Sequence, residues 1–416
     1  MKSYLVGGAV RDFLLGRPIK DRDWVVVGAS PEQLLAQGYQ SVGKDFPVFL
    51  HPETHEEYAL ARTERKIGTG YHGFACDTGA HIRLEDDLAR RDLTINAMAQ
   101  DQDGHIIDPY GGQADLQAKL LRHVSPAFAE DPLRVLRVAR FAARYAHDGF
   151  CVAPDTLALM QDIVNQGELA HLTPERVWLE THKALAESRP DVYIQVLRDC
   201  GALKVLFSEL DQLFGVPQRA EYHPEIDTGT HLLMCLQVAA RDNLPTRVRF
   251  AVLLHDLGKG ITPAHVLPRH LGHEQAGVPL VKAFCQRYKV PKDYQQLAEL
   301  VCEYHLECHR VVELQAKTLY KKLQQLDALR RPERFGEFLL ACKADTQGRL
   351  GWEHKAYPQV VYFEQARQIA AAISPKQLAP DAQRLTGLAL GEALNKARIH
   401  ALSLFKQDYH ATHNNS

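Results

Sequence analysis

The sequence contains no long apolar run. No stretch of it approaches the roughly 18 consecutive apolar residues of a membrane-spanning helix. Residues 1–12 contain charges and a glycine pair where a secretory signal would have an apolar segment. We therefore expect a cytoplasmic protein with no membrane partner.

The chain also lacks paired cysteines and a large net charge. Its eight cysteines are scattered from Cys76 to Cys342 without a Cys-x-x-Cys pair, which is typical of reduced thiols and not of a disulfide framework or a zinc knuckle. The formal net charge is only −2. This value does not exclude nucleic acid as a partner, because a nucleic-acid-binding protein needs a local basic face and not a basic total.

A chain of 416 residues is long enough for several domains of about 100 to 200 residues each. Its first part alternates short helical stretches with β-rich runs at residues 23–28, 47–51, 58–62, 94–100 and 105–108. From residue 131 onward the pattern predicts helices, at residues 132–145, 154–166, 174–187, 190–200, 229–241, 248–254 and 293–305. Turn-rich breaks at residues 215–224 and 330–332 predict later domain boundaries. The expected fold class is α+β, with a mixed head and a helical body.

The clearest motif is Gly7-Gly8 followed by Arg11, Asp21 and Asp23. Residues two apart on a strand project from one face, so Asp21 and Asp23 are expected to present paired carboxylates that suit two magnesium ions. A glycine pair before a helix lets backbone amides approach a phosphate closely, and Arg11 adds a charged contact. Each feature alone is more often a turn or a solvated strand edge. Their joint order points to nucleotidyl transfer.

Two basic segments follow the first strands. Residues 62–73 combine three glycines with basic residues, which suits either a phosphate-facing loop or a plain surface loop. Arg134, Arg137, Arg140 and Arg144 lie at spacings of three, three and four, which places them along one side of a predicted helix. The stripe has no interspersed carboxylates, and like charges repel unless an anion lies among them. An anion-binding helix is therefore favoured over a solvated charged face.

The second part of the chain carries an ordered set of histidines and aspartates. The set comprises His231, His255, Asp256, His270, His273, His305 and Asp345. Histidine and aspartate are natural ligands for a divalent transition metal, and adjacent His255 and Asp256 near a helix end can both face one ion. Any one of these histidines alone is more often an ordinary core or surface residue. The whole set favours a metal centre that activates water for attack on a phosphate ester.

These motifs resemble those of a known family. The matching residues are Gly7-Gly8 with Asp21 and Asp23, Arg90-Arg91-Asp92 with Asn96, and Glu130-Asp131-Pro132-Leu133-Arg134 with Arg137 and Arg140. In this order they resemble the motifs of the bacterial-type, class II CCA-adding tRNA nucleotidyltransferases. Over nearly the whole chain, the similarity is to the multifunctional CCA proteins of gamma-proteobacteria, which append a metal-dependent phosphohydrolase domain of the HD family.

The resemblance implies a polymerase-β-type nucleotidyltransferase head, an all-helical body and a helical HD domain. The expected boundaries are residues 1–140 for the head and residues 141–227 for a helical neck that binds nucleotide and tRNA. Residues 228–329 would form the HD phosphohydrolase domain. Residues 330–416 would form a helical C-terminal region that supplies Asp345.

The activity implied for the head is template-independent addition and repair of the 3′-terminal CCA of tRNA, from CTP and ATP with release of pyrophosphate. The catalytic pair that holds Mg²⁺ corresponds to Asp21 and Asp23. The nucleotide-binding positions correspond to Gly8, Arg11, Arg91, Asp131, Arg134, Arg137 and Arg140. Asp131 and Arg134 would read the base edge, since cytosine and adenine both display an amine beside a ring nitrogen. In the family, a flexible loop at residues 62–73 is associated with the switch to A addition.

The activities implied for the HD domain are 2′,3′-cyclic phosphodiesterase, 2′-nucleotidase and phosphatase. The expected ligands of a transition metal, with Ni²⁺ as the expected ion, are His231, His255, Asp256 and Asp345. His273 and His305 are further candidates for a second metal or for phosphate. The expected partners are the tRNA acceptor end, CTP and ATP, and the protein is expected to be a monomer or a homodimer.

Two other functions fit parts of the sequence. A bacterial poly(A) polymerase shares the head, but it typically has a basic extension and no HD centre, and both features disagree with this chain. An HD phosphohydrolase whose head only binds nucleotide or tRNA is the other alternative. The paired carboxylates Asp21 and Asp23 count against it, because a binding module does not need them.

Overall fold

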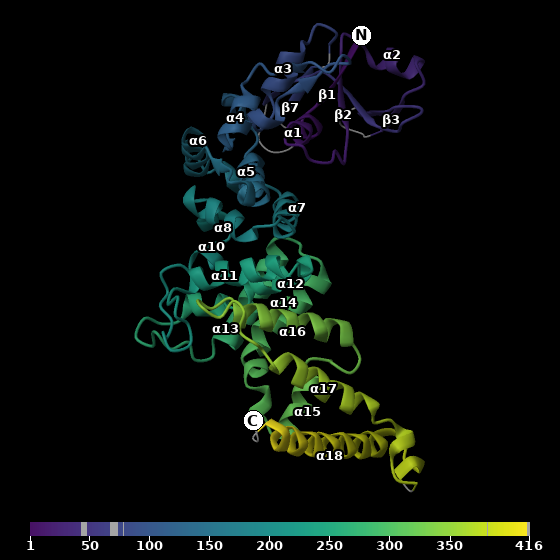
Figure 1. The fold of residues 1–416 in the computed structure, drawn as a ribbon, viewed down its shortest axis with the longest axis vertical. Helices are drawn as coiled ribbons and strands as arrows, with labels where there is room; N and C mark the ends of the chain where they lie inside the picture. Colours follow the sequence, from purple (N-terminus) through teal and green to yellow (C-terminus); the bar gives the residue numbers. More distant parts are fainter. Residues whose placement is uncertain (43–47, 67–73, 78, 381, 414–416) are drawn as a thin grey trace. The chain divides into compact units, whose positions relative to one another are not determined.

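The computed structural model describes residues 1–42, 48–66, 74–77, 79–380 and 382–413 (Figure 1). The chain divides into two units, residues 1–208 and residues 209–416. None of the helices in these described ranges is both long and apolar enough to cross a membrane.

A mixed sheet forms the centre of the first unit, in the order β3-β4-β5-β2-β1-β8-β9. Its strands are β1 (Lys2–Val6), β2 (Asp23–Val27), β3 (Gln40–Val42), β4 (Val48–Leu50), β5 (Glu57–Leu60), β8 (Ala99–Gln100) and β9 (Ile106–Ile107). β2 is antiparallel to β1 and parallel to β5. The register of β2 and β5 pairs Asp23 with Glu57, so these two carboxylates belong to the same end of the sheet.

The valines of β2 are buried on both faces of this sheet. Val25 packs in one apolar cluster with Leu88, and Val26 packs in a second cluster with Leu34 and Phe49. Adjacent strand residues point to opposite faces, so a continuous apolar run predicts a strand that is covered on both sides. Helix α2 (Pro31–Ala36) contributes Leu34 and helix α3 (Leu84–Ala89) contributes Leu88. Each such side chain stabilises the fold by about 1.5 to 3 kcal/mol when fully buried.

Three local features of the head differ from the sequence-based expectation. The strand predicted over residues 94–100 is wrong in its first half, because Thr94–Asn96 form a 3₁₀ turn. Thr94 donates a hydrogen bond to Asp115 and Asn96 donates one to Asp92, and such local polar contacts compete with a strand ladder. β1, which the pattern did not predict, lies between β2 and β8. Asp21 precedes β2, so the predicted pair straddles the start of the strand.

Helices complete the first unit. They include α1 (Gly8–Leu14), α5 (Leu133–Tyr145), α6 (Pro154–Asn165), α7 (Pro174–Leu185) and α8 (Pro190–Asp199). The four predicted helices between residues 132 and 200 agree with α5 to α8 within two residues at each end. Pro154, Pro174 and Pro190 each begin a helix, where the missing amide costs nothing. α5 packs against α7 and α8, which brings its arginines beside α7.

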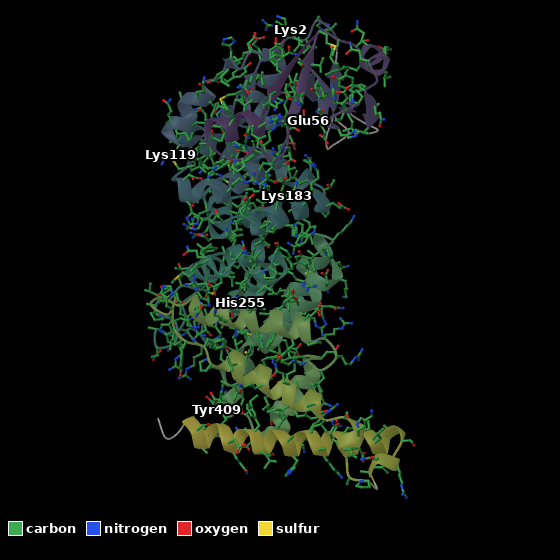
Figure 2. All side chains as sticks on the ribbon, turned by 45° about the vertical axis from the view of Figure 1, so that its right-hand side comes forward. Lys2, Glu56, Lys119, Lys183, His255 and Tyr409 are labelled. Carbon is green, nitrogen blue, oxygen red and sulfur yellow. The ribbon has the colours of Figure 1, made fainter. Side chains whose placement is uncertain are left out.

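The second unit is helical. Its main helices are α11 (Thr228–Arg241), α12 (Thr246–Leu254), α13 (His273–Arg287), α14 (Lys292–His309), α15 (Ala316–Gln325), α16 (Pro332–Gln347), α17 (Gln359–Ala372) and α18 (Gly387–His413). α12 is central, since every residue from Val248 to Leu254 is buried and it packs against α11, α14 and α16. A helix buried on all sides needs an apolar sequence all round. His255 follows α12 directly and lies among the helices of this unit (Figure 2).

Two candidate active sites

The turn between β1 and α1 requires glycine at position 7. Gly7 has φ +69°, and a Cβ there would come within 2.8 Å of Arg91 Nη1. Gly8 begins α1, and a Cβ on it would lie 3.4 Å from Arg11 Nη2. The guanidinium groups of Arg11 and Arg91 therefore both lie close to the backbone of this turn. The sequence analysis expected Gly8, Arg11 and Arg91 to contact a nucleotide, and the structure brings the three residues together at this turn.

Three carboxylates flank the same end of the sheet. Asp23 is the first residue of β2, Asp21 lies two residues before it, and Glu57 is the register partner of Asp23 on β5. Partial burial raises the pKa of Asp23, Arg91 opposes this rise, and the charge of Asp21 adds to it. Carboxylate oxygens are the ligands that Mg²⁺ prefers, and a bound cation would offset the negative charge that raises the pKa of Asp23. The residues present therefore fit Mg²⁺.

A chain of hydrogen bonds connects α1 to α5. Arg11 Nη1 donates to Asn96 Oδ1 at 2.6 Å, and Asn96 Nδ2 donates to Asp92 Oδ1 at 3.0 Å. The other oxygen of Asp92 accepts from Arg137 Nε at 2.9 Å and from Arg137 Nη2 at 2.7 Å. Burial alone would raise the pKa of Asp92, but Arg137 and the hydrogen bonds outweigh burial and lower it to about 2. Asp92 and Asn96 thus hold two predicted nucleotide-binding arginines in one network.

The arginine stripe of α5 is matched by two carboxylates, Glu180 on α7 and Glu187 just after this helix. Arg140 Nε donates to Glu180 Oε2 at 2.7 Å, and Arg144 Nη2 lies 2.7 Å from Glu187 Oε1. The expectation that no carboxylate interrupts the stripe holds only within α5 itself. Arg140 is buried, with a side chain 7% exposed, so it is held by protein partners. Glu180 and Glu187 lie about 40 residues away in sequence, and no local pattern connects them to the arginines.

The side chains of the two predicted base-reading residues contact different groups of the protein. Asp131 accepts hydrogen bonds of 2.9 and 3.2 Å from Arg176 Nη2, a residue on α7 that the sequence analysis did not select. Arg134 instead donates to the backbone carbonyl oxygens of Ala127 and Arg90. The glycine-rich segment at residues 62–73, predicted as a phosphate-facing or surface loop, falls largely on residues 67–73, which lie outside the described residues.

The second site brings together the predicted histidines and aspartates of the second unit. All six predicted ligands are buried: His231 on α11, His255 and Asp256 after α12, His273 on α13, His305 on α14 and Asp345 on α16. Their ligand atoms form two adjoining clusters, one containing His231, Cys235, His255 and Asp345 and the other containing Asp256, His273 and His305. Within each cluster the ligand atoms all lie within 4.8 Å of one another.

Main-chain carbonyls fix the orientation of three imidazoles. The Nδ1 atoms of His255, His273 and His305 lie 2.7, 2.7 and 3.0 Å from the carbonyl oxygens of residues 252, 270 and 301. Nδ1–H therefore donates outward and the Nε2 lone pair faces the cluster, as metal-binding histidines require. The Nδ1 atom of His231 lies 2.9 Å from Glu225 Oε1, so a carboxylate orients the fourth ring.

Several buried polar atoms at this centre lack a hydrogen-bond partner. Among the described residues, they include His255 Nε2 and both carboxylate oxygens of Asp256. Lys259 Nζ lies 2.7 Å from Asp256 Oδ2, which supplies charge but not the geometry of a hydrogen bond. A buried polar atom without a hydrogen-bond partner costs free energy. Nitrogen and oxygen atoms that face one another in this state, each with a lone pair to share, fit a divalent transition metal.

Sequence reasoning missed four residues of this centre. They are Cys235, Glu225, His309 and Tyr357. Asp345 Oδ2 lies 2.7 Å from His309 Nε2, whose Nδ1 lies 2.7 Å from the Tyr357 hydroxyl. His309 follows His305 by one helical turn and Cys235 follows His231 by one turn, so the spacing of four was the available signal. Glu225 lies in a loop and has no such signal.

Family models match three parts of the chain: "Poly A polymerase head domain" at residues 3–122, "Probable RNA and SrmB- binding site of polymerase A" at residues 149–214, and "HD domain" at residues 228–331. The curated "Multifunctional CCA protein" of Hahella chejuensis is 60% identical over 98% of this chain and 96% of its own. The protein of the same name from Pseudomonas aeruginosa is 60% identical over 98% of this chain and 99% of its own.

Solved structures show the same fold at low identity. The Bacillus stearothermophilus CCA-adding enzyme in complex with CTP has a TM-score of 0.62 and 23% identity, and the match covers 99% of this chain and 94% of that one. The Thermotoga maritima CCA-adding enzyme complexed with tRNA has a TM-score of 0.62 and 20% identity, covering 97% and 87%. Together with the family models, these neighbours confirm the expected α+β class, with a polymerase head and an HD domain.

Proposed function

We propose a function from the premise that this chain belongs to the multifunctional CCA protein family, whose members it matches at 60% identity over nearly its whole length. The chain is a tRNA nucleotidyltransferase that adds C, C and A to the 3′ end of tRNA from CTP and ATP. One observation carries the proposal: Asp23 is paired in register with Val6, which precedes the glycine turn that Arg91 covers, and the carboxylates of Asp21 and Glu57 belong to the same end of the sheet. A cytoplasmic location, and a monomeric or homodimeric state, remain expectations that accompany it.

In the head, Asp21 and Asp23 would hold Mg²⁺, and Glu57 is placed to assist them. When bound, magnesium lowers the pKa of the attacking hydroxyl and neutralises charge on the leaving group. The tRNA 3′-oxygen attacks the α-phosphorus of CTP or ATP, its proton is lost, and the bond to pyrophosphate breaks. Gly8 gives the triphosphate access to backbone amides, while Arg11 and Arg91 supply positive charge beside them.

The choice of base would rest on Asp131 and Arg134. Asp131 would accept from the exocyclic amine of cytosine or adenine, and Arg134 would donate to the ring nitrogen beside it. Arg176 would orient Asp131, since its guanidinium contacts both carboxylate oxygens. Arg137 and Arg140 would add positive charge on the same helix, oriented by Asp92 and Glu180.

The direct test incubates the full chain with a tRNA lacking CCA, Mg²⁺ and labelled CTP and ATP, and sizes the products at single-nucleotide resolution. Addition of C, C and A in that order supports the proposal. Asp21→Asn and Asp23→Asn should each slow addition by on the order of 10² to 10³. Asp103→Asn, which changes an exposed carboxylate of the same unit, is the matched control. Full addition by the Asp23 variant would refute the metal assignment.

For the second site, we propose a phosphohydrolase with 2′,3′-cyclic phosphodiesterase, 2′-nucleotidase and phosphatase activities. The residues that would hold a transition metal, with Ni²⁺ as the proposed ion, are His231, His255, Asp256 and Asp345. His273 and His305 adjoin Asp256 and would serve a second metal or the phosphate. When bound, such a metal supplies hydroxide near neutral pH. Lys259, whose Nζ lies 2.7 Å from Asp256 Oδ2, would add positive charge beside the phosphate ester.

The test of the second site is hydrolysis of a 2′,3′-cyclic nucleotide by chelator-treated protein, with Ni²⁺, Co²⁺, Mn²⁺ or Mg²⁺ added back. Activity that returns with Ni²⁺ and is lost in His255→Ala supports the assignment. CCA addition by the same variant should stay intact, because the two sites use different residues. Hydrolysis that survives chelation and the His255 substitution would overturn the proposal.

The match to a poly(A) polymerase head favours a second candidate activity, in which the enzyme adds A residues to an RNA end without first adding C residues. The same extension assay separates the two activities, because a poly(A) polymerase produces a long ladder from ATP alone. An absence of any extension would leave the HD phosphohydrolase as the main activity and the head as a binding module.

A further inference from the structure

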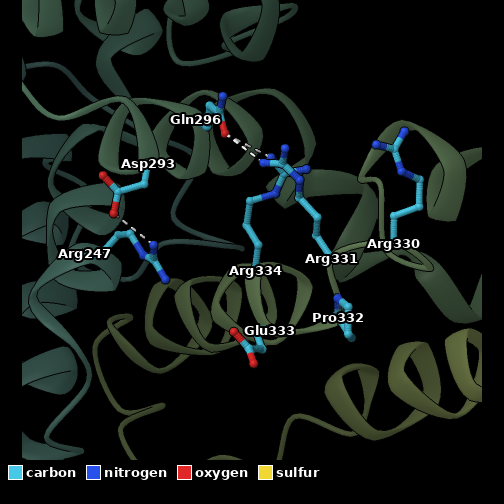
Figure 3. A pocket seen from close by; sticks show the side chains of 8 residues that line it. All are labelled: Arg247, Asp293, Gln296, Arg330, Arg331, Pro332, Glu333 and Arg334. Atoms are coloured by element: carbon cyan, nitrogen blue, oxygen red, sulfur yellow. Dashed lines mark hydrogen bonds and ion pairs between the residues drawn. The ribbon is translucent and has the colours of Figure 1, made fainter.

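A cavity of about 400 Å³ lies in the second unit, and none of the residues that line it is a predicted metal ligand (Figure 3). The residues that line it are Arg247, Asp293, Gln296, Arg330, Arg331, Pro332, Glu333 and Arg334. We call it the arginine pocket, because half of its lining residues are arginines. The proposed activities use none of these residues.

The arginine pocket lies at the N-terminal ends of three packed helices. Arg247 belongs to the first turn of α12, Gln296 to the second turn of α14, and Arg334 to the first turn of α16. Each of these helices carries or precedes a predicted metal ligand at its other end, and about 12 to 17 Å of helix axis separates the pocket residue from that ligand. The positive ends of three helix dipoles thus add to the charge of the arginines.

Three arginines of the pocket share a single carboxylate. Arg330, Arg331 and Arg334 all face Asp327, at N–O distances of 3.6, 3.5 and 3.6 Å, which are long for hydrogen bonds. Arg331 Nη1 and Arg334 Nη1 both donate to the neutral Gln296 Oε1, at 3.1 and 3.4 Å. Arg334 Nε is buried and has no hydrogen-bond partner among the described residues. The guanidinium groups of Arg331 and Arg334 lie beside each other in Figure 3.

The other charges around the pocket do not remove this surplus. Arg247 is satisfied by Glu337 at 2.7 Å and by Asp293 at 3.0 Å. Glu333 points away from the guanidinium groups of Arg331 and Arg334 (Figure 3). Burial lowers the pKa of Arg334, and the neighbouring Arg331 lowers it further, while Asp327 opposes both. Positive charge held close together in this way is stabilised when an anion lies among it.

We propose that the arginine pocket binds backbone phosphate groups of the RNA substrate. Guanidinium groups match phosphate oxygens in pairs, and a phosphate between Arg331 and Arg334 would supply negative charge where three arginines share the single Asp327 carboxylate. The pocket shares its three helices with a site proposed to act on phosphate esters at an RNA end, which favours RNA as the source of the phosphate. The inference rests on the proposed function for its choice of tRNA as the RNA.

The test compares Arg330→Gln/Arg331→Gln with a matched control, Lys317→Gln/Lys321→Gln, which removes two exposed positive charges from α15. Both members of the first pair are largely exposed, with side chains 82% and 51% accessible, so the fold should tolerate the change. The Kd for tRNA is measured over a salt series. The pocket variant should bind about tenfold more weakly at low salt, with a slope of log Kd against log salt smaller by about 1 to 2.

In the extension assay, the pocket variant should show a raised KM for tRNA with kcat unchanged at saturation, and the control should match wild type in every measurement. Unchanged affinity and salt slope in the pocket variant would overturn the inference, even if wild type adds CCA normally. If the wild-type protein adds no CCA but the pocket variant still binds RNA more weakly, the proposed function is wrong and the inference about the pocket holds.

Inorganic phosphate and ATP are titrated separately by calorimetry. If the pocket variant loses only their binding and keeps full tRNA affinity, the pocket binds a free anion and the RNA inference is wrong.

Discussion

Single residues decide how well the second site is prepared for a metal. Glu225 lies 2.9 Å from Nδ1 of His231, and the pKa of Glu225 is held well below its usual value because its contacts with His223 and His231 outweigh the effect of burial. A carboxylate in this position keeps the imidazole in one orientation and makes its other nitrogen a stronger donor. Glu225 is thus a positioning residue.

We predict that Glu225→Gln weakens metal binding at the second site by about 10- to 100-fold and reduces hydrolysis at limiting metal. High metal concentration should restore most of the activity, because the ligands themselves remain. The measurement is cyclic-nucleotide hydrolysis against Ni²⁺ concentration. Glu221→Gln, at an exposed carboxylate nearby in sequence, is the control. A Glu225 variant with the wild-type metal titration would show that Glu225 does not position His231.

Asp92 makes the head sensitive to acid. Its pKa falls from an ordinary value of 3.8 to about 2, because Arg137 and the hydrogen bonds from Asn96 and Arg137 outweigh burial. A carboxylate with a lowered folded-state pKa contributes stability above its unfolded pKa and loses that contribution as the pH falls through the folded value. The shift corresponds to about 2 kcal/mol, present above roughly pH 4 and lost toward pH 2.

We predict that the stability gap between wild type and Asp92→Asn shrinks by about 1 kcal/mol between pH 6 and pH 3. Urea unfolding of the first unit can be followed by the fluorescence of Trp24 and Trp178 in a Trp352→Phe background. Asp162→Asn, at an exposed position of α6, should keep a constant gap to wild type. A pH-independent gap for the Asp92 variant would mean that folding does not lower the pKa of the Asp92 carboxylate.

At the scale of elements, a buried ion pair holds α5 to α7. The side chains of Arg140 and Glu180 are 7% and 4% exposed, and their closest atoms are 2.7 Å apart. Removing one member of a buried pair leaves the other charge without its partner, which costs far more than losing a surface pair. The contact also fixes where the arginine stripe lies relative to the head.

We predict that Glu180→Ala destabilises the first unit by about 3 kcal/mol, the lower end of the range for a broken buried pair, because Glu187 remains 3.7 Å from Arg140. Urea unfolding by the same fluorescence measures the change. Asp162→Ala on α6 should stay within about 0.5 kcal/mol of wild type, as surface substitutions do. A Glu180 variant as stable as that control would show that Arg140 finds an equivalent partner.

At the scale of the whole molecule, the chain carries its two proposed chemistries in separate units, so a metal ligand should affect only one of them. We predict that Ni²⁺ at about 100 times its Kd stabilises the second unit by about 2.7 kcal/mol and raises its Tm by roughly 5 to 10 °C. Trp352 reports on this unit, and Trp24 and Trp178 report on the first. The Tm of the first unit, reported by Trp24 and Trp178, should not change.

Asp345→Ala provides the control for this prediction, because it removes a proposed ligand from α16. The variant should lose most of the Ni²⁺-induced shift in the Trp352 signal. An equal shift in the variant and in wild type would place the stabilising metal elsewhere on the chain.

Local patterns in the sequence determined much of this protein. The valine run of β2, the prolines that begin α6, α7 and α8, and the adjacent ligand types His255 and Asp256 each depend on neighbours within a few residues. Such patterns report strand alternation, helix starts and ligand types directly. They were sufficient for the fold class and for most of the helices, and the order of motifs along the whole chain, through the resemblance to the HD family, added the six predicted ligands that the structure brings together.

Only the tertiary structure decided which distant groups meet. Glu180 reaches Arg140 from another helix, Arg176 of α7 contacts Asp131, and Glu57 joins Asp23 through the parallel pairing of β5 and β2. The arginine pocket exists because three helices begin at one place. These contacts form through packing between elements far apart in the chain, and no residue spacing encodes the register or direction of that packing.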